Sequence, residues 1–179
     1  DYSSYNTPWN GFKSQIKEIV IGNGITDVGA YAFYGCSEAE KITIPEGVKY
    51  LRDYAFSYCR KIKEISLPST LSAIYFNAFE WCEALESITI PDGIDIIHNY
   101  VFRGCSSLKT VVLPESVVQL AQGSFAHCIK LESINIPSNV KIIGPQAFFC
   151  CESASLSLVS SSAFFAASIS ASCSANSSA

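Results

Sequence analysis

The sequence predicts an α/β repeat solenoid, in which 23-residue units stack on one another through short parallel strands. Three observations support this prediction. One period holds over six copies, each copy contains a strand-like motif that ends at proline, and a return segment follows with apolar residues at threes. The chain has 179 residues, of which 49% are hydrophobic. That composition is enough for an elongated array with a continuous core.

The period is visible in seven columns of residues, each spaced by 23 positions. The phenylalanine column is Phe33, Phe56, Phe79, Phe102, Phe125 and Phe148. The cysteine column is Cys36, Cys59, Cys82, Cys105, Cys128 and Cys151. The proline column is Pro45, Pro68, Pro91, Pro114 and Pro137. Four further columns hold aliphatic residues, such as Ile19, Ile42, Ile65, Ile88, Val111 and Ile134. Agreement of this extent identifies a repeat protein.

Each unit of the repeat has a physical interpretation. The I-x-I-P segment, as at 88–91, alternates apolar and polar residues and stops at a proline, which donates no backbone hydrogen bond, so it predicts a short strand. The V-x-x-I and A-F-x-x-C-x-x-L segments place apolar residues at threes, which suits a 3₁₀ or short helical turn. Such a unit buries its apolar side only against the next copy, so the strands stack in parallel about 4.8 Å apart.

The segment LESITIPDGIDIIHNYVFRGCSSLKTVVLP at 85–114 resembles the leucine-rich repeats of the BspA-like family, also called the Treponema pallidum type. The resemblance covers about residues 16–152, and proline, phenylalanine and cysteine all recur in register. It implies a right-handed leucine-rich-repeat solenoid with parallel strands on its concave side. The glycine of the I-G pair in the family's repeat pattern is kept at Gly29 and Gly144. In the four repeats between them it is replaced by Arg52, Tyr75, His98 and Ala121.

The N-terminal end of the array differs from the repeats. Residues 1–15 lie outside the period and are predicted to form an N-terminal cap or entry segment. Trp9 and Phe12 are the apolar residues expected to cover the open end of the core, because terminal repeats need a cap. Residues 16–152 are then the leucine-rich-repeat array.

The C-terminal end is also atypical. Residues 153–179 hold 12 Ser and 7 Ala, and no charge follows Glu152. Leu156 nevertheless lies 22 residues after Ile134, so a trace of the repeat persists. We interpret 153–179 as a degenerate seventh repeat or as a disordered Ser/Ala-rich tail.

Composition and charge limit the classes of partner. The net charge of −4 gives no reason to expect nucleic acid or an anionic membrane as a partner. No apolar run approaches the ~20 residues that a membrane helix needs, so we expect no direct membrane insertion. The chain contains no Met and begins at Asp1 without a leader pattern, so we expect a mature or truncated piece of a secreted protein.

The cysteines and histidines carry no predicted chemistry. One cysteine per turn predicts a file of buried thiols, and a disulfide is considered only for Cys150, Cys151 and Cys173. The absence of a C-x-x-C pair argues against a metal site. His98 and His127 lie near cysteines in the sequence, but no orienting third residue accompanies them. We therefore expect no catalytic residue, metal or cofactor.

The outward positions of the strands hold the candidate binding surface. One column of these positions alternates in charge, from Lys17 and Glu40 onward to Glu132. Opposite charges on neighbouring strands predict ion pairs of ~0.2–1 kcal/mol each. Such a face is soluble and discourages edge association, and it also suits a polar platform for a protein or glycan. The candidate residues are Lys41, Thr43, Lys63, Glu64, Ser66, Glu86, Ser87, Thr89, Lys109, Thr110, Val112, Glu132, Ser133 and Asn135.

A second group of candidate residues is aromatic. Tyr31, Tyr54 and Tyr100 share one repeat position, and Tyr58 and Trp81 share another. These rings are expected either to shield the thin convex side of the solenoid or to contact a protein or a sugar.

The family resemblance implies a non-catalytic adhesion or protein-binding module at the cell surface, outside the cell. The expected partner is a protein or glycan ligand on a host, matrix or neighbouring cell, bound by a monomer. Two alternatives are a passive spacer that projects another domain from the cell surface, and an enzyme whose site the sequence does not reveal. A concave pocket with clustered titratable groups favours the enzyme, whereas a flat face with paired charges argues against it.

Overall fold

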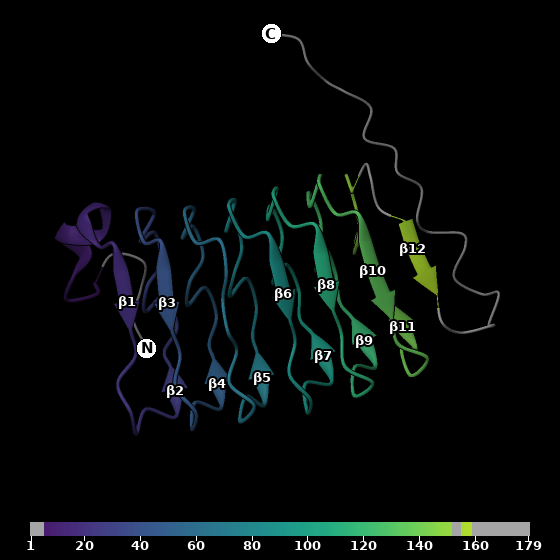
Figure 1. Cartoon of the computed structure of the whole chain (residues 1–179), viewed down its shortest axis with the longest axis horizontal. Helices are drawn as coiled ribbons and strands as arrows, with labels where there is room; N and C mark the ends of the chain where they lie inside the picture. The colour runs from purple at the N-terminus through teal and green to yellow at the C-terminus, as the bar shows by residue number, and fades with distance from the viewer. Residues whose placement is uncertain (1–5, 152–154, 159–179) are drawn as a thin grey trace, which may run out of the picture.

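Each repeat runs once around an elongated solenoid and comes to lie beside the same residues of the next repeat (Figure 1). The computed structural model describes residues 6–151 and 155–158. Two rows of parallel strands follow the long axis, one of longer strands and one of two-residue strands. The longer strands are β1 (Glu18–Val20), β3 (Lys41–Thr43), β6 (Ser87–Thr89), β8 (Thr110–Val112), β10 (Ser133–Ile136) and β12 (Ser155–Leu158). The shorter strands are β2 (Asp27–Val28), β4 (Tyr50–Leu51), β5 (Ala73–Ile74), β7 (Ile96–Ile97), β9 (Gln119–Leu120) and β11 (Ile142–Ile143).

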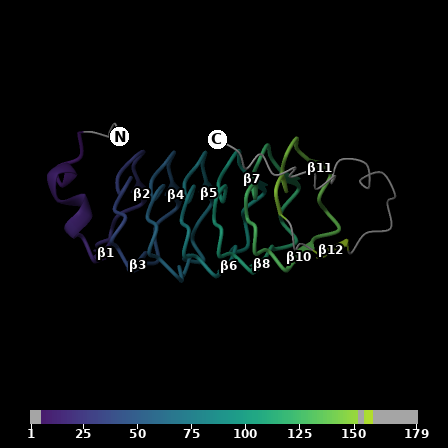
Figure 2. The same cartoon turned by 90° about the horizontal axis from the view of Figure 1, so that it is seen from above.

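The strand register follows the sequence period. Every strand pair among the described residues is parallel, as predicted. Ile88 of β6 lies opposite Val111 of β8, which lies opposite Ile134 of β10, each 23 residues further on. Ile134 in turn lies opposite Leu156 of β12, an offset of 22 residues. The repeats therefore stack in register along one axis (Figure 2).

Phenylalanine rings and thiols fill the interior. The middle residue of each three-residue strand is buried and its two neighbours are exposed. Phe79 and Phe102 are fully buried and stack with ring centroids 5.7 Å apart. The thiol of Cys82 donates to the carbonyl oxygen of Phe56, one repeat earlier, at 3.4 Å. The equivalent bond recurs at Cys59, Cys105, Cys128 and Cys151. This confirms the predicted file of buried thiols.

The N-terminal segment carries the helix η1 (Asn10–Gln15), a 3₁₀ helix. Trp9, which precedes it, stacks on Phe33 with centroids 5.2 Å apart, and so extends the phenylalanine file by one ring. Phe12 is 60% exposed and does not cover the core, which corrects the expectation for this residue. Phe12 belongs to η1, and no residue of this helix is buried.

The return legs consist of turns and short strands. Cys82 N donates to Phe79 O at 3.2 Å and Leu85 N to Cys82 O at 3.1 Å, the i to i−3 pattern of a 3₁₀ turn. The V-x-x-I segment was expected to form a turn as well, but its last two residues form a short strand. Within residues 6–151 and 155–158, η1 is the only helix, so the helical part of the predicted α/β class is limited to η1 and these turns.

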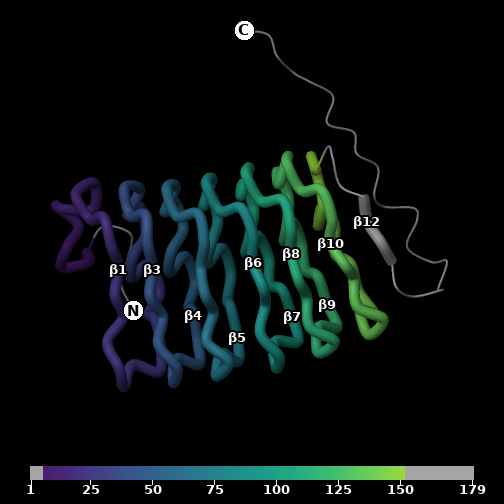
Figure 3. Tube along the Cα trace, viewed as in Figure 1, coloured from purple at the N-terminus to yellow at the C-terminus, as the bar shows by residue number. Residues whose placement is uncertain are grey.

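The row of longer strands is interrupted at the third strand motif, where Figure 1 draws no arrow between β3 and β6, while the chain trace continues there in the same coil (Figure 3). Residues 64–66 form no strand, so β1–β3 and β6–β8–β10–β12 are separate sheets. This corrects the strand that the I-x-L-P segment at 65–68 predicts. The backbone amides of 64–67 donate no hydrogen bond to any residue that the structure describes, whereas Ile90 N donates to Val112 O at 2.9 Å at the equivalent place of the next repeat.

Candidate binding surface on the strand face

The candidate residues of the predicted binding surface lie together on one side of the solenoid. All of them are exposed; Lys63, Glu64 and Ser66 belong to the interrupted segment, and the others come from β3, β6, β8, β10 and the residues adjoining these strands. We call this surface the strand face. Because strands alternate the direction of their side chains, the buried middle residues fix which neighbours point outward.

Two of the predicted cross-strand ion pairs are present on this face. Lys41 Nζ lies 3.0 Å from Glu18 Oε1, and Lys109 Nζ lies 3.4 Å from Glu86 Oε2. Lys63 stands between Glu40 and Glu86 in the alternating column but makes no ion pair within the described part of the chain. The strand face is therefore only partly neutralised, and one ammonium group is left for a ligand.

The first predicted pair of the column is replaced by another. Lys17 Nζ contacts Glu38 Oε2 at 2.7 Å, and Lys61 Nζ contacts the same oxygen at 2.8 Å. Glu38 lies on the turn before β3, outside the alternating column, so the sign pattern alone did not identify it. Hydrogen bonds from Lys17 first, and then from Lys61, lower the pKa of the Glu38 carboxyl to about 2.

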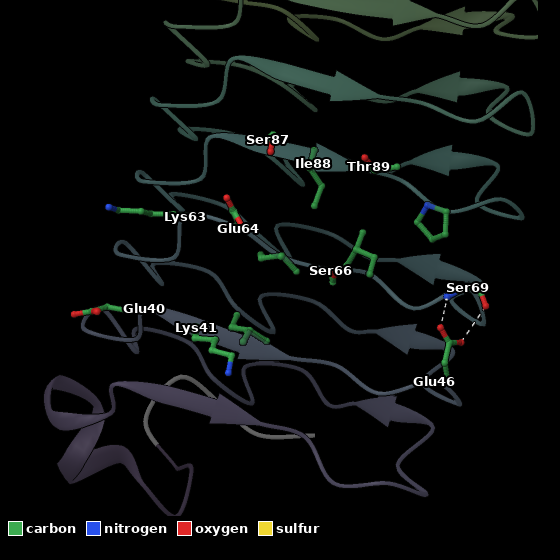
Figure 4. Close-up of a pocket in the computed structure, with 14 residues that line it drawn as sticks. Glu40, Lys41, Glu46, Lys63, Glu64, Ser66, Ser69, Ser87, Ile88 and Thr89 are labelled. Carbon is green, nitrogen blue, oxygen red and sulfur yellow. Dashed lines mark hydrogen bonds between the residues drawn. The ribbon is translucent and has the colours of Figure 1, made fainter.

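The interruption opens a depression of about 860 Å³ in the strand face (Figure 4). Its floor contains the buried side chains of Ile42, Ile65 and Ile88. Hydroxyl and charged groups surround this floor, contributed by Lys41, Lys63, Glu64, Ser66, Ser87 and Thr89. We call this the strand-face depression. It combines apolar contact area with hydrogen-bonding groups of both kinds, the usual composition of a recognition site.

One end of the strand-face depression is held by a side-chain clamp. Ser69 donates from its backbone N and from its hydroxyl to the Glu46 carboxylate, each at 3.0 Å, as the dashed lines in Figure 4 mark. Hydrogen bonding from the Ser69 backbone lowers the pKa of Glu46 below its ordinary value. Thr70 strengthens the link, because its hydroxyl accepts from Gly47 N and donates to Val48 O, both at 2.9 Å.

The backbone contributes to the depression as well. The amides of 64–67 have no hydrogen-bond acceptor in the described chain. The array remains continuous beneath them, since Glu86 N donates to Lys63 O at 3.0 Å and Phe56 N to Ala78 O at 2.9 Å.

The aromatic residues form a second surface on the return legs. Tyr31 stacks on Tyr54 at 4.8 Å, and Tyr58 stacks on Trp81 at 6.4 Å. Tyr100 instead faces Arg103, whose guanidinium carbon lies 5.5 Å from the ring centroid. All of these side chains are half-buried. We call this surface the aromatic flank, and it is formed by Tyr31, Tyr34, Tyr54, Tyr58, Trp81 and Tyr100.

The thiols of the column from Cys36 to Cys128 are unsuited to nucleophilic chemistry, because burial raises the pKa of each. Burial raises the pKa of Cys82 to about 12, so the thiolate is scarce at neutral pH. The two cysteines near histidines donate elsewhere, Cys105 to Phe79 O at 3.3 Å and Cys128 to Phe102 O at 3.2 Å. Among the described residues, no three His, Cys, Asp or Glu side chains gather as metal ligands.

The predicted C-terminal disulfide candidates differ from one another. Cys150 is disulfide-bonded and Cys151 is free, whereas Cys173 lies outside the described residues.

Over the same described ranges, no helix has the length and apolar character needed to cross a membrane.

The sequence matches the family model for the BspA-type leucine-rich repeat region, in six copies, over residues 10–92 and 72–178. No curated protein matches the chain. Among solved structures, the chain is similar to a leucine-rich repeat protein from Bacteroides ovatus, with 38% sequence identity and a TM-score of 0.77 over 81% of this chain and 38% of that one.

Two further solved structures are similar. A leucine-rich cell surface protein from Faecalibacterium prausnitzii is 32% identical, with a TM-score of 0.71 over 78% of this chain and 38% of that one. The T. pallidum leucine-rich repeat protein is 24% identical, with a TM-score of 0.66 over 79% of both chains, and this likeness shows the fold alone. The chain therefore spans 38% of the length of each of the first two proteins.

Proposed function

Because the chain belongs to the BspA-type leucine-rich repeat family, we propose that it is a non-catalytic protein-binding module of a cell-surface protein, and that the strand face binds the partner. The observation that carries this proposal is the strand-face depression. There the sheet is interrupted, and within the described residues the amides of 64–67 have no acceptor and Lys63 has no ion-pair partner.

A protein partner suits the chemistry of this surface. An extended segment of a ligand can accept hydrogen bonds from the free amides and cover the floor formed by Ile42, Ile65 and Ile88. An acidic side chain of the ligand would pair with Lys63. We place the partner on a host, matrix or neighbouring cell, and the Faecalibacterium prausnitzii relative, described as a cell surface protein, supports an extracellular location.

A second candidate function is a passive spacer. It is favoured by the continuous stack of phenylalanine rings and by the ion pairs Lys41–Glu18 and Lys109–Glu86, which make a stiff and soluble rod. The two functions are distinguished by whether a change confined to the strand-face depression alters binding.

The test uses the intact chain and a panel of immobilised extracellular-matrix proteins and intact cells. The variant Lys63→Glu/Ser66→Arg alters two exposed residues of the strand-face depression. The matched control, Lys49→Glu/Ser72→Arg, makes the same change of charge and volume at exposed residues outside it. We expect the first variant to lose at least tenfold in affinity for the bound partner and the control to bind as the wild type does.

Two results would contradict the proposal. If both double variants retain wild-type affinity while their melting temperatures are unchanged, binding does not use the strand-face depression. If the wild-type chain binds no member of the panel, the spacer is the better description.

A further inference from the structure

A separate feature of the aromatic flank is a gap in its tyrosine column. The repeat position that holds Tyr31, Tyr54 and Tyr100 is occupied by Asn77 between the last two. All four residues have a left-handed backbone, with φ of 58–60°. Each backbone amide donates to a carbonyl of the next repeat, as Tyr54 N does to Phe76 O at 3.0 Å and Asn77 N to Asn99 O at 3.1 Å. These bonds hold the column at fixed spacing on the return legs.

The rings on either side of Asn77 leave room between them. Tyr54 is stacked on Tyr31, with an interplanar angle of 8°. Tyr100 lies over Gly123, where an added Cβ would stand 2.5 Å from its ring, so it is displaced toward the following repeat. The side chain of Asn77 is short and buried. A cavity of about 500 Å³ results, and both tyrosines line it.

The width of this cavity suits one ring. Tyr54 and Tyr100 are two repeats apart, which at about 4.8 Å per repeat separates equivalent atoms by roughly 10 Å. A ring inserted between them needs about 3.5–4.0 Å of van der Waals distance on each face, or about 7–8 Å in all. A single flat or chair-shaped ring therefore fits between the two tyrosines and can stack on either of them.

The rim of the cavity supplies hydrogen-bonding groups. Asp53 uses one carboxylate oxygen to accept from Phe76 N at 3.1 Å, and its second oxygen faces no donor in the described chain. Asn99 contributes an amide, and the two tyrosines contribute hydroxyls. Arg103 donates to the buried Glu80 carboxylate at 3.3 Å and keeps further N–H groups for a ligand.

The charges of the rim argue for a neutral ligand. Glu80 and Arg103 compensate each other as an ion pair, which leaves the single negative charge of Asp53. A phosphate, sulfate or carboxylate of a ligand would face that charge without a free cation to match it. Aromatic walls with mixed donors and acceptors at the rim are complementary to a sugar, whose ring faces carry C–H groups and whose edges carry hydroxyls.

We propose that this cavity, formed by Asp53, Tyr54, Asn77, Asn99, Tyr100 and Arg103 and here called the Asn77 slot, binds one neutral pyranose residue of a glycan. The Asn77 slot lies on the return legs and shares no residue with the strand-face depression, so it is independent of the proposed protein site. The chain then presents two recognition surfaces, one for protein and one for carbohydrate.

The test is a glycan array with neutral termini (glucose, galactose, mannose and N-acetylglucosamine) and acidic termini, followed by NMR titration with the corresponding methyl pyranoside. The variant Asn77→Tyr completes the tyrosine column and fills the slot with the residue that neighbouring repeats already carry there. The comparison variant, Gln146→Tyr, introduces the same residue at the same repeat position, in the neighbouring cavity on the other side of Tyr100 and Arg103. Asn99→Ala removes a rim amide without altering the column.

We expect the wild-type chain and Gln146→Tyr to bind a neutral pyranoside with equal affinity. Asn77→Tyr and Asn99→Ala should each weaken that binding at least tenfold, with thermal unfolding showing that both variants are folded. Should Asn77→Tyr fail to fold, Asn99→Ala decides the matter alone. Wild-type affinity in the folded slot variants, binding to acidic termini only, or no binding to any neutral glycan would each overturn the proposal.

Discussion

The phenylalanine file and the charged column of the strand face have the same 23-residue period but opposite environments. The rings from Phe33 to Phe148 stack at 5.4–5.7 Å with interplanar angles of 5–10°. Each ring is the packing surface of the next, so a change of size at one position disturbs both neighbours. The column from Lys17 to Glu132 is exposed, and its members pair with some neighbours and not with others.

This difference separates stability from recognition. The buried column is uniform because a close-packed stack accepts one shape, and it sets the axis of the solenoid. The exposed column varies in charge and pairing because water solvates whatever is left unpaired. Where a surface charge has no ion-pair partner in the described residues, as at Lys63, a ligand can bind to it without disturbing the buried phenylalanine stack. Binding specificity can therefore change from one array to another while the core columns stay the same.

The largest expected effect comes from breaking the buried file. Replacing Phe102, which is fully buried between Phe79 and Phe125, by Ala removes a ring from both stacks and leaves a cavity. We expect the free energy of unfolding to fall by about 3–5 kcal/mol, measured by chemical denaturation. The exposed Phe12 is the control, and Phe12→Ala should change it by less than about 0.5 kcal/mol. Equal effects of the two changes would refute the assignment of the stack as the stabilising core.

A smaller effect is expected where a charged group lies at the edge of the strand face. The pKa of Glu38 is lowered to about 2 by Lys17 and Lys61, so its ionised form favours the folded state. A lowered pKa contributes stability above the ordinary value of 4.5, and this contribution is lost as the pH falls through about 2. We expect Glu38→Gln to be less stable than wild type at pH 7, with a difference that shrinks as the pH falls toward 2, by thermal unfolding across this range. A difference that does not shrink with falling pH would contradict the ion-pair assignment.

The smallest effect belongs to a single pair within the exposed column. Glu86 and Lys109 are each about half-exposed and 3.4 Å apart, so solvent screens their attraction. A double-mutant cycle with Glu86→Ala and Lys109→Ala should give a coupling of about 0.2–1 kcal/mol that decreases in 1 M salt. A coupling above about 2 kcal/mol would show that the strand face is as important to stability as the buried file.

The sequence predicted what depends on the period and on polarity. The parallel register, the burial of the phenylalanine and cysteine columns, and the exposure of the strand-face residues all follow from repeated apolar spacing, and the structure confirms each. It predicted the pairs Lys41–Glu18 and Lys109–Glu86 but not the pair Lys17–Glu38, because the latter depends on a side-chain conformation that a sign pattern does not specify. The 3₁₀ turns were foreseen, but the two-residue strands beside them were not.

The interruption at 64–67 was also beyond the sequence. The segment ISLP at 65–68 has the same polarity and the same proline as ITIP at 88–91, so nothing local distinguishes it. The gap at Asn77, by contrast, had a visible signal, since an asparagine stands between tyrosines at one repeat position. Its meaning depended on Tyr100 lying over Gly123, a contact between repeats.

Hydrogen exchange tests the central claim most directly. The amides of 64–67 donate no hydrogen bond in the structure, whereas those of β8 lie inside a sheet with β6 and β10 on its two sides. In the free chain, peptides covering 64–67 should exchange at least tenfold faster than peptides covering 110–112, and a bound protein partner should slow exchange at 64–67 selectively. Equal protection of the two segments in the free chain would contradict the account, because the strand face would then carry no interruption for a partner to occupy.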